Sequence, residues 1–311
     1  MESGPECGGG DKLTIAACYL SPEGIVLGAD STTTVNIPGN PHYFINAQKL
    51  FEIGENSTLG AVTWGLGSIG TSHRALLAKL ADELARNEPN SVEEAARRWA
   101  ELFWNEYSTV STASPLAPSF AELRQLVGKA PHDPNTAPSV EMRTAEEEVR
   151  FGVLRIGLTV GFCIGGHIIR DRQPAAYEVL FDPISLALPT PLQLPMNNPR
   201  FWGAPNMILR LLRGCDEGLR QSILRSGKWN GTEQDLNGLI SQHTLGHAIL
   251  PIRDAIDFTH ACIASTIKAL KFSNLSQICG GSIEIAVITA DRRFRWVRHK
   301  AWDAAIADGG T

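Results

Sequence analysis

The chain has 311 residues, of which 43% are hydrophobic and 20% are charged. This is enough apolar material for a substantial core, and it excludes the compositions of disordered and fibrous proteins. The formal net charge of -5 produces no field that would attract nucleic acid or an anionic membrane, so we expect neither partner.

The N-terminal residues and the cysteines indicate where the protein resides. No stretch reaches the roughly 20 apolar residues that cross a bilayer. The sequence MESGPECGGGDK has neither the basic start nor the apolar core of a signal peptide. The six cysteines show no CxxC pair and no zinc spacing, which is typical of reduced thiols. We therefore expect a cytoplasmic protein.

Motifs for metals and nucleotides are also lacking. His243 and His247 have helical spacing, but Gly246 separates them and the Glu of an HExxH site is missing. The glycines at 65, 67 and 70 form no GxGxxG motif and are followed by no Walker lysine. We expect neither a metal nor a cofactor.

Two strand pairs are predicted in the first quarter of the chain. Apolar runs at 13–20 and 24–30 flank the turn-forming residues 21–23, which is typical of a β-hairpin. Further runs at 49–53 and 58–64 form the second pair.

Two helices are predicted next. The first has apolar residues at helical spacing, namely Leu76, Leu77, Leu80 and Leu84. Ser91 and Glu94 form a capping box that starts a second helix, which we expect to reach about Tyr107. Residues 112–147 contain five prolines and little pattern, so we expect a loop insertion or a lid there.

The second half repeats this order of strands and helices. The pattern predicts strands at 156–164 and 175–181, a helix around Met207 and Leu211, a long helix over 252–270, and strands at 283–289 and 294–298. Hairpin-linked strands pair antiparallel, whereas helices with a single apolar stripe lie outside the sheets. A doubly wound parallel sheet is disfavoured, because it needs single strands alternating with single helices.

We predict a flexible leader at 1–12 and a single α/β (α+β) domain at 13–311, with the insertion at 112–147. The expected architecture is a four-layer αββα sandwich of two antiparallel sheets flanked by helices.

Several segments resemble the proteasome β subunits, which are N-terminal-nucleophile (Ntn) hydrolases. The strand at 24–31 ends in Ala-Asp-Ser, a Lys-x-x-x-Ile strand follows at 49–53, and a Gly-rich turn leads into the first helix. The match covers residues 14–80, and it recurs at 280–288 in the Gly-Gly-x-apolar pattern of the last strands.

This resemblance implies a threonine-type peptidase whose nucleophile becomes N-terminal by self-cleavage and whose own α-amine helps as base. The matching residues are Thr14 as nucleophile, Lys49 as the cation that eases its deprotonation, and Asp30 as the carboxylate that holds Lys49. Taken singly, each has an ordinary alternative: Asp30 as a turn residue, Lys49 as a solvated lysine, and Thr14 as a β-favouring residue.

The resemblance also implies an oxyanion site and a specificity pocket. A backbone N–H of Trp64 or Gly65 would hold the oxyanion, and the alignment leaves that choice open. Ala61 and Val62 would line a pocket for small or apolar side chains. The implied substrate is a peptide or an unfolded protein, and the implied assembly is a homo-oligomeric ring.

The chain departs from the active family at three places. Gly203-Ala204-Pro205 replaces a Ser-Gly-Ser turn, residues 276–279 lack the Asp-x-x-Ser pattern, and Leu13 replaces the Gly that precedes the cleaved bond. The alternative interpretation is therefore a catalytically inactive ring or scaffold subunit.

Overall fold

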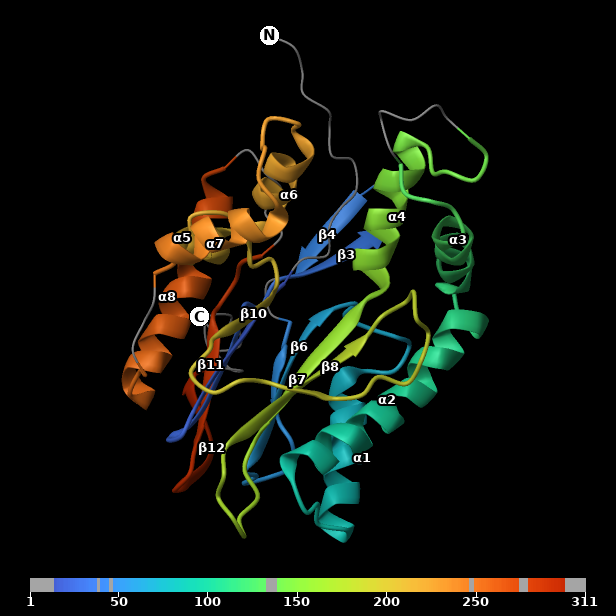
Figure 1. Ribbon diagram of the computed structural model, residues 1–311. Helices are drawn as coiled ribbons and strands as arrows, with labels where there is room; N and C mark the ends of the chain where they lie inside the picture. The colour runs from blue at the N-terminus through green and yellow to red at the C-terminus, as the bar shows by residue number, and fades with distance from the viewer. Residues whose placement is uncertain are drawn as a thin grey trace, which may run out of the picture.

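Two antiparallel sheets of five strands each form the centre of the molecule in the computed structural model (Figure 1). The structure describes residues 14–37, 40–44, 47–132, 139–245, 249–273 and 279–299, without the side chains of 34–43. The expected leader at 1–12 lies outside this range.

The first sheet has the strand order β10-β1-β2-β11-β12. Its strands are β1 Ile15–Ser21, β2 Gly24–Ala29, β10 Arg200–Gly203, β11 Glu284–Thr289 and β12 Arg292–Arg298. The second sheet has the order β5-β6-β7-β8-β9. Its strands are β5 Leu50–Glu52, β6 Leu59–Gly65, β7 Val160–Gly166, β8 Ala175–Phe181 and β9 Leu192–Gln193. A separate ribbon pairs β3 Thr33–Ile37 with β4 Asn40–Phe44.

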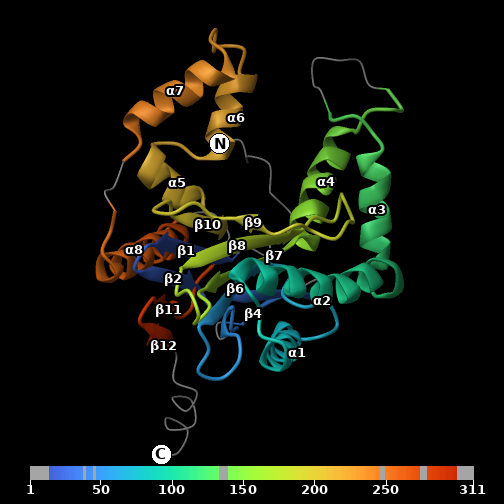
Figure 2. The ribbon, with the colours of Figure 1, turned by 60° about the horizontal axis from the view of Figure 1, so that its bottom comes forward.

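Helices cover the outer faces of both sheets. They are α1 His73–Arg86, α2 Val92–Ala113, α3 Ala117–Val127, α4 Ala145–Leu158, α5 Asn206–Arg213, α6 Glu217–Arg225, α7 Glu233–His243 and α8 Ile252–Lys271. Helices α3 and α4 project on one side of the sandwich, and α6 and α7 project on the other (Figure 2).

Three clusters of buried hydrophobic side chains fill the spaces between the layers. Alternate residues of a strand point to opposite faces, so β1 directs Ile15 and Tyr19 toward α8 but Cys18 toward the second sheet. The second sheet packs its outer face, including Phe162, against α1 and α2. The order helix, sheet, sheet, helix confirms the predicted sandwich of two antiparallel sheets.

Residues 112–147 are not the patternless loop that the prolines suggested. They contain α3, which buries Phe120, Leu123 and Leu126 along one face. They also contain the start of α4, where Thr144 and Glu147 form a capping box. The described prolines are compatible with this segment, because Pro118 lies in the first turn of α3 and Pro115 and Pro131 lie outside the helices. Residues 133–138 lie outside the described chain.

The strand expected at 156–164 begins later than predicted. Residues 156–158 are the last turn of α4, and β7 starts at Val160, because the apolar residues of the two elements follow each other without a turn signal. The second helix extends to Ala113, beyond the expected end near Tyr107. The sequence patterns also missed β3, β4, β9, β10, α6 and α7.

Candidate functional site

A buried ion pair connects the two sheets at one end of the sandwich. Asp30 directly follows β2 and Lys49 directly precedes β5. The Lys49 Nζ lies 2.6 Å from the Asp30 Oδ1, and the two residues are 6% and 0% exposed. The structure therefore brings together two of the residues that the sequence predicted for the site.

Three backbone N–H groups also donate to the Asp30 carboxylate. Ile15 N donates to Oδ1 at 3.1 Å, while Thr32 N and Gly280 N donate to Oδ2 at 3.2 and 2.9 Å. Together with Lys49 these donors satisfy a carboxylate that has no access to water. Through these hydrogen bonds the Asp30 carboxylate links the start of β1, the segment after β2 and the segment before β11.

Thr14 lies immediately before β1 and is 6% exposed. Its carbonyl oxygen accepts a hydrogen bond from Ala204 N at 2.8 Å. Gly203 has φ +81, and a Cβ on it would overlap the Thr14 carbonyl oxygen, so this close approach requires glycine. Because Ile15 N bonds Asp30, the Thr14 backbone is held between the carboxylate and β10.

Trp64 and Gly65 end β6 at the same end of the sandwich. The Trp64 ring stacks on Trp202 of β10, with centroids 4.4 Å apart and planes 9° from parallel. Gly65 has φ +85 and approaches the Thr159 carbonyl so closely that a Cβ would overlap it. Thr63 N donates to the Lys49 carbonyl at 2.9 Å, which places the end of β6 beside Lys49.

A cavity of about 450 Å³ opens beside this end of β6. Trp64, Gly65 and Gly203 form one wall, and residues of α4 form the other. Since Gly203 packs against the Thr14 backbone, the cavity reaches the neighbourhood of the predicted nucleophile.

The structure contradicts the prediction for Ala61 and Val62. Both residues are 0% exposed, and they belong to different core clusters on opposite faces of the second sheet. Consecutive strand residues cannot line one pocket, because their side chains alternate between the two faces.

Sequence reasoning recognised the Gly-Gly segment near the C-terminus but not what it does at the site. Gly280 supplies a donor to Asp30, and the Ser31 Oγ donates to the Ser282 carbonyl at 2.7 Å. Cys279 is buried beside them. Burial, aided by the charge of Asp30 and opposed by Lys49, raises the pKa of its thiol to about 12. The signal that could have found these contacts is the Gly-Gly motif itself.

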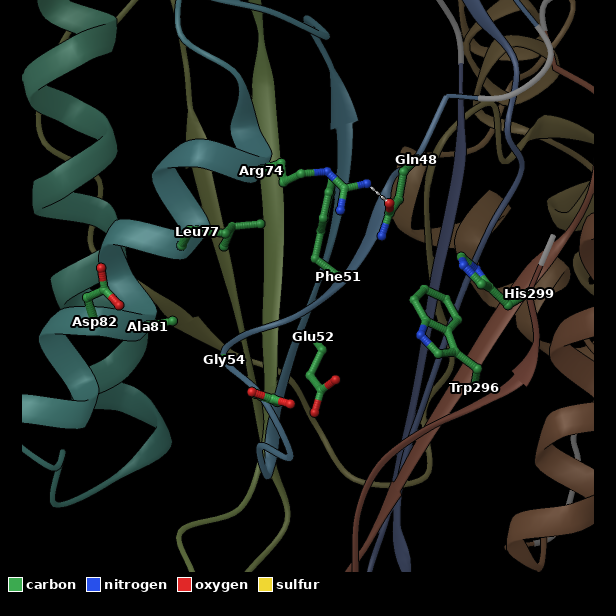
Figure 3. Close-up of a pocket in the computed structure, with 12 residues that line it drawn as sticks. Gln48, Phe51, Glu52, Gly54, Arg74, Leu77, Ala81, Asp82, Trp296 and His299 are labelled. Carbon is green, nitrogen blue, oxygen red and sulfur yellow. Dashed lines mark hydrogen bonds between the residues drawn. The ribbon is translucent and has the colours of Figure 1, made fainter. Parts of the chain in front are cut away.

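A second cavity, of about 510 Å³, lies at the edge of the sandwich between β5, α1 and β12 (Figure 3). Arg74 donates to the Gln48 amide oxygen on one wall, and Trp296 and His299 lie on the opposite wall. Among the described residues that line it, none is Ser, Thr or Cys. This sandwich-edge cavity therefore offers no hydroxyl or thiol nucleophile.

None of the helices in the described ranges is long and apolar enough to cross a bilayer. In the same ranges, no three His, Cys, Asp or Glu residues are grouped so that they could hold a metal ion. His243 ends α7, and His247 lies outside the described residues.

No protein-family model matches the sequence, and no curated protein matches it. Among solved structures, the chain is similar to the Anbu (Gly-1) mutant from Hyphomicrobium sp. strain MC1, with 11% sequence identity and a TM-score of 0.49. The similarity covers 95% of this chain and 90% of that chain. At this identity and TM-score it assigns the chain to no family, so function rests on the residues of the site.

Proposed function

We propose that the chain is a proteasome-like N-terminal-nucleophile hydrolase that cleaves peptide bonds with Thr14 as nucleophile. The observation that carries this proposal is the buried Lys49–Asp30 pair, whose carboxylate also binds the N–H of the residue after Thr14. A buried ion pair is an inefficient source of stability, because desolvation of both ions offsets their attraction. A catalytic role at Thr14 is a better explanation for a buried ion pair that is hydrogen-bonded to the first residue of β1.

The proposed reaction requires cleavage of the Leu13–Thr14 bond, which frees the Thr14 α-amine. The Thr14 hydroxyl then adds to the substrate carbonyl, and its proton passes to that amine. Collapse of the adduct breaks the C–N bond, and the leaving amine takes the proton. Water hydrolyses the remaining ester and restores Thr14. The Lys49 ammonium stabilises the negative charge that develops on the Thr14 oxygen.

Strand alternation favours Gly65 over Trp64 as the oxyanion donor. Thr63 N points toward the β5 edge of β6, where it binds the Lys49 carbonyl. Successive N–H groups alternate between the two edges, so Trp64 N points toward β7 and Gly65 N points to the same edge as Lys49. Leu66 N, which donates to the Thr159 carbonyl at 2.8 Å, fits this alternation. Because β5 begins at Leu50, Gly65 N projects past its end toward the site.

A non-catalytic ring or scaffold subunit is the second candidate. The segment Gly203-Ala204-Pro205 favours it, because it carries no hydroxyl where the active family has a Ser-Gly-Ser turn, and the Ala204 N–H is occupied by the Thr14 carbonyl. Cys279 stands where the active family has the Ser of its Asp-x-x-Ser pattern, and burial raises the pKa of its thiol to about 12, so it supplies no thiolate at neutral pH in place of that serine.

The mass of the purified chain and its hydrolysis of fluorogenic peptide amides test the proposal together. We expect loss of residues 1–13 and measurable hydrolysis. Thr14→Ala should retain the full chain and abolish hydrolysis, whereas Thr14→Ser, which keeps a hydroxyl, should retain both reactions in part. Hydrolysis that survives Thr14→Ala rejects Thr14, and an uncleaved, inactive chain supports the scaffold subunit.

Both candidates share self-association into a ring, since closed cyclic symmetry is common among soluble homo-oligomers. Light scattering at micromolar concentration should then give a multiple of the 33.7 kDa chain mass. A mass equal to one chain contradicts the ring without affecting the assignment of Thr14.

A further inference from the structure

The cavity beside β6 has one wall from the candidate site and one wall from α4. Gly65 and Gly203 belong to the first wall, so a ligand in the cavity lies next to the Thr14 backbone. Its volume of about 450 Å³ is in the range of small-ligand sites. It can accept one or two residues of a peptide.

The charged residues that line this cavity are Glu148 and Arg155. The Glu148 carboxylate already has partners within the chain, because Arg143 Nε donates to it at 2.7 Å and His132 N donates to it at 3.0 Å. The hydrogen bond from Arg143 lowers the pKa of the Glu148 carboxyl. Arg155 is exposed and forms no ion pair with any residue that the structure describes. The cavity therefore has one uncompensated positive charge.

The remaining lining is largely apolar. Trp64, whose indole stacks on Trp202, lies on one side, and Phe151 and Ile156 of α4 lie on the other. Phe151 is fixed by the Arg143 guanidinium, which lies 4.1 Å from its ring centre. An occupant with an apolar body and an anionic group would match both features.

We propose that this cavity binds a substrate residue that combines an apolar body with a carboxylate, and that Arg155 is the residue that selects the carboxylate. A guanidinium binds a carboxylate through two parallel hydrogen bonds, which a neutral amide cannot reproduce. The carboxylate can be the C-terminus of a short peptide or an acidic side chain. As a statement about substrate, this inference rests on the proposed peptidase function.

Arg155 also lies in the last turn of α4, where a cation stabilises the helix dipole. Arg225 provides the matched control, because it lies in the last turn of α6, is exposed and has no ion-pair partner within the described ranges. A helix-end role alone predicts that Arg155→Gln and Arg225→Gln behave alike.

Binding is measured by calorimetry on the Thr14→Ala chain, so that no turnover is needed. The probes are N-acetylphenylalanine, its amide, and N-acetylglutamate amide, which separate a terminal carboxylate from a side-chain carboxylate. We expect at least one carboxylate probe to bind about tenfold more tightly than the neutral amide, as expected for a hydrogen bond to a charged group. Arg155→Gln should remove this preference, and Arg225→Gln should keep it.

A second pair of variants tests occupancy of the cavity without changing charge. Gly152 lines the cavity, and a Cβ built there meets no atom within 4 Å, so Gly152→Leu adds bulk to the cavity without a backbone clash. Gly157 lies on the same helix with equally open surroundings but does not line the cavity. We expect Gly152→Leu to weaken binding about tenfold or more and Gly157→Leu to leave it unchanged.

Equal binding of acid and amide, or a preference that survives Arg155→Gln, overturns the inference. So does unchanged binding in Gly152→Leu. These outcomes are independent of hydrolysis: carboxylate binding by the Thr14→Ala chain, together with no hydrolysis by the unmutated chain, rejects the proposed function but keeps the site. Hydrolysis by the unmutated chain without any preference for carboxylate probes rejects the carboxylate site but keeps the proposed peptidase function.

Discussion

Asp30, which directly follows β2, and Glu284, which begins the neighbouring strand β11, are two fully buried carboxylates with different partners. Glu284 pairs in register with Ala29, the residue before Asp30. Asp30 has an ammonium and three backbone N–H donors. Glu284 faces the imidazole of His299, whose Nδ1 is 2.8 Å from Oε1 and whose side chain is 22% exposed. An imidazole is charged only when it is protonated, whereas a lysine normally keeps its charge at neutral pH.

Burial alone therefore does not distinguish the carboxylate of the proposed site from a carboxylate that pairs with an imidazole. Asp30 is linked to β1 and to the start of β5, where the predicted nucleophile and cation lie. Glu284 instead pairs with His299, which lines the sandwich-edge cavity (Figure 3). The expected cost of disturbing each carboxylate follows from its partners.

The largest effect is expected for Lys49→Ala, which leaves Asp30 buried without its counter-ion. We expect the free energy of unfolding to fall by about 3–5 kcal/mol, measured by urea denaturation. Arg97→Ala, which breaks the exposed pair with Glu101, is the control and should cost at most about 1 kcal/mol. A similar small loss for Lys49→Ala would show that the Asp30 pair is not buried in solution.

His73 is a buried titratable residue without an ionic partner, and it extends the comparison of the two buried carboxylates to an unpaired group. The His73 Nε2 has no hydrogen-bond partner among the described residues, and the ring packs edge-on against Phe103 and Phe162. Burial lowers the pKa of His73 from 6.5 to about 4. The unfolded chain therefore takes up the proton first, and stability is lost as the pH falls from about 6.5 to about 4.

The expected loss is about 3 kcal/mol over this interval, since one pKa unit corresponds to about 1.4 kcal/mol. His73→Phe removes the titrating group and should flatten the dependence, measured as urea midpoints at several pH values. Identical pH profiles for the two proteins would mean that His73 is accessible to protons in the folded state.

The smallest effect is expected for Glu284→Gln. Gln keeps the shape of the side chain, and the partly exposed His299 can exchange the carboxylate for water, so we expect a loss of about 1 kcal/mol. Asp30→Asn, the matched change, should cost more because it leaves the buried Lys49 ammonium unpaired. Equal losses in thermal or urea denaturation would remove the distinction between the two carboxylates.

The strand pairs β1–β2 and β5–β6 and the start of α2 were predictable from the sequence. A continuous apolar run such as Ile15–Ser21 indicates a strand that is buried on both faces, and it can be recognised without knowing which distant elements cover it. Ser91 accepts the Glu94 N–H at the start of α2, which is one half of the predicted capping box; the Glu94 carboxylate accepts from Asn90 N instead of from the Ser91 N–H. These signals depend on neighbouring residues alone.

Other elements lacked such signals. Strand β10 has four residues, all half-buried, and it is defined by its pairing with β1. Helix α3 was hidden by prolines at its ends, and α4 merged with β7 because no turn residue separates their apolar positions. Ala61 and Val62 were assigned to a pocket that burial on opposite faces excludes.

The sequence by itself indicated the alternation of paired strands and helices that builds a sandwich, without β3, β4, β9, β10, α3, α6 and α7, and its resemblance to the proteasome β subunits singled out Thr14, Asp30, Lys49, Trp64 and Gly65. Tertiary structure decided which groups surround them. Gly280 donates to Asp30 across 250 residues of sequence, and Gly203 of β10 meets the end of β6 at the cavity only after the two sheets have stacked. Periodicity records which face of an element is buried, whereas the partners of a buried charge depend on how distant elements pack.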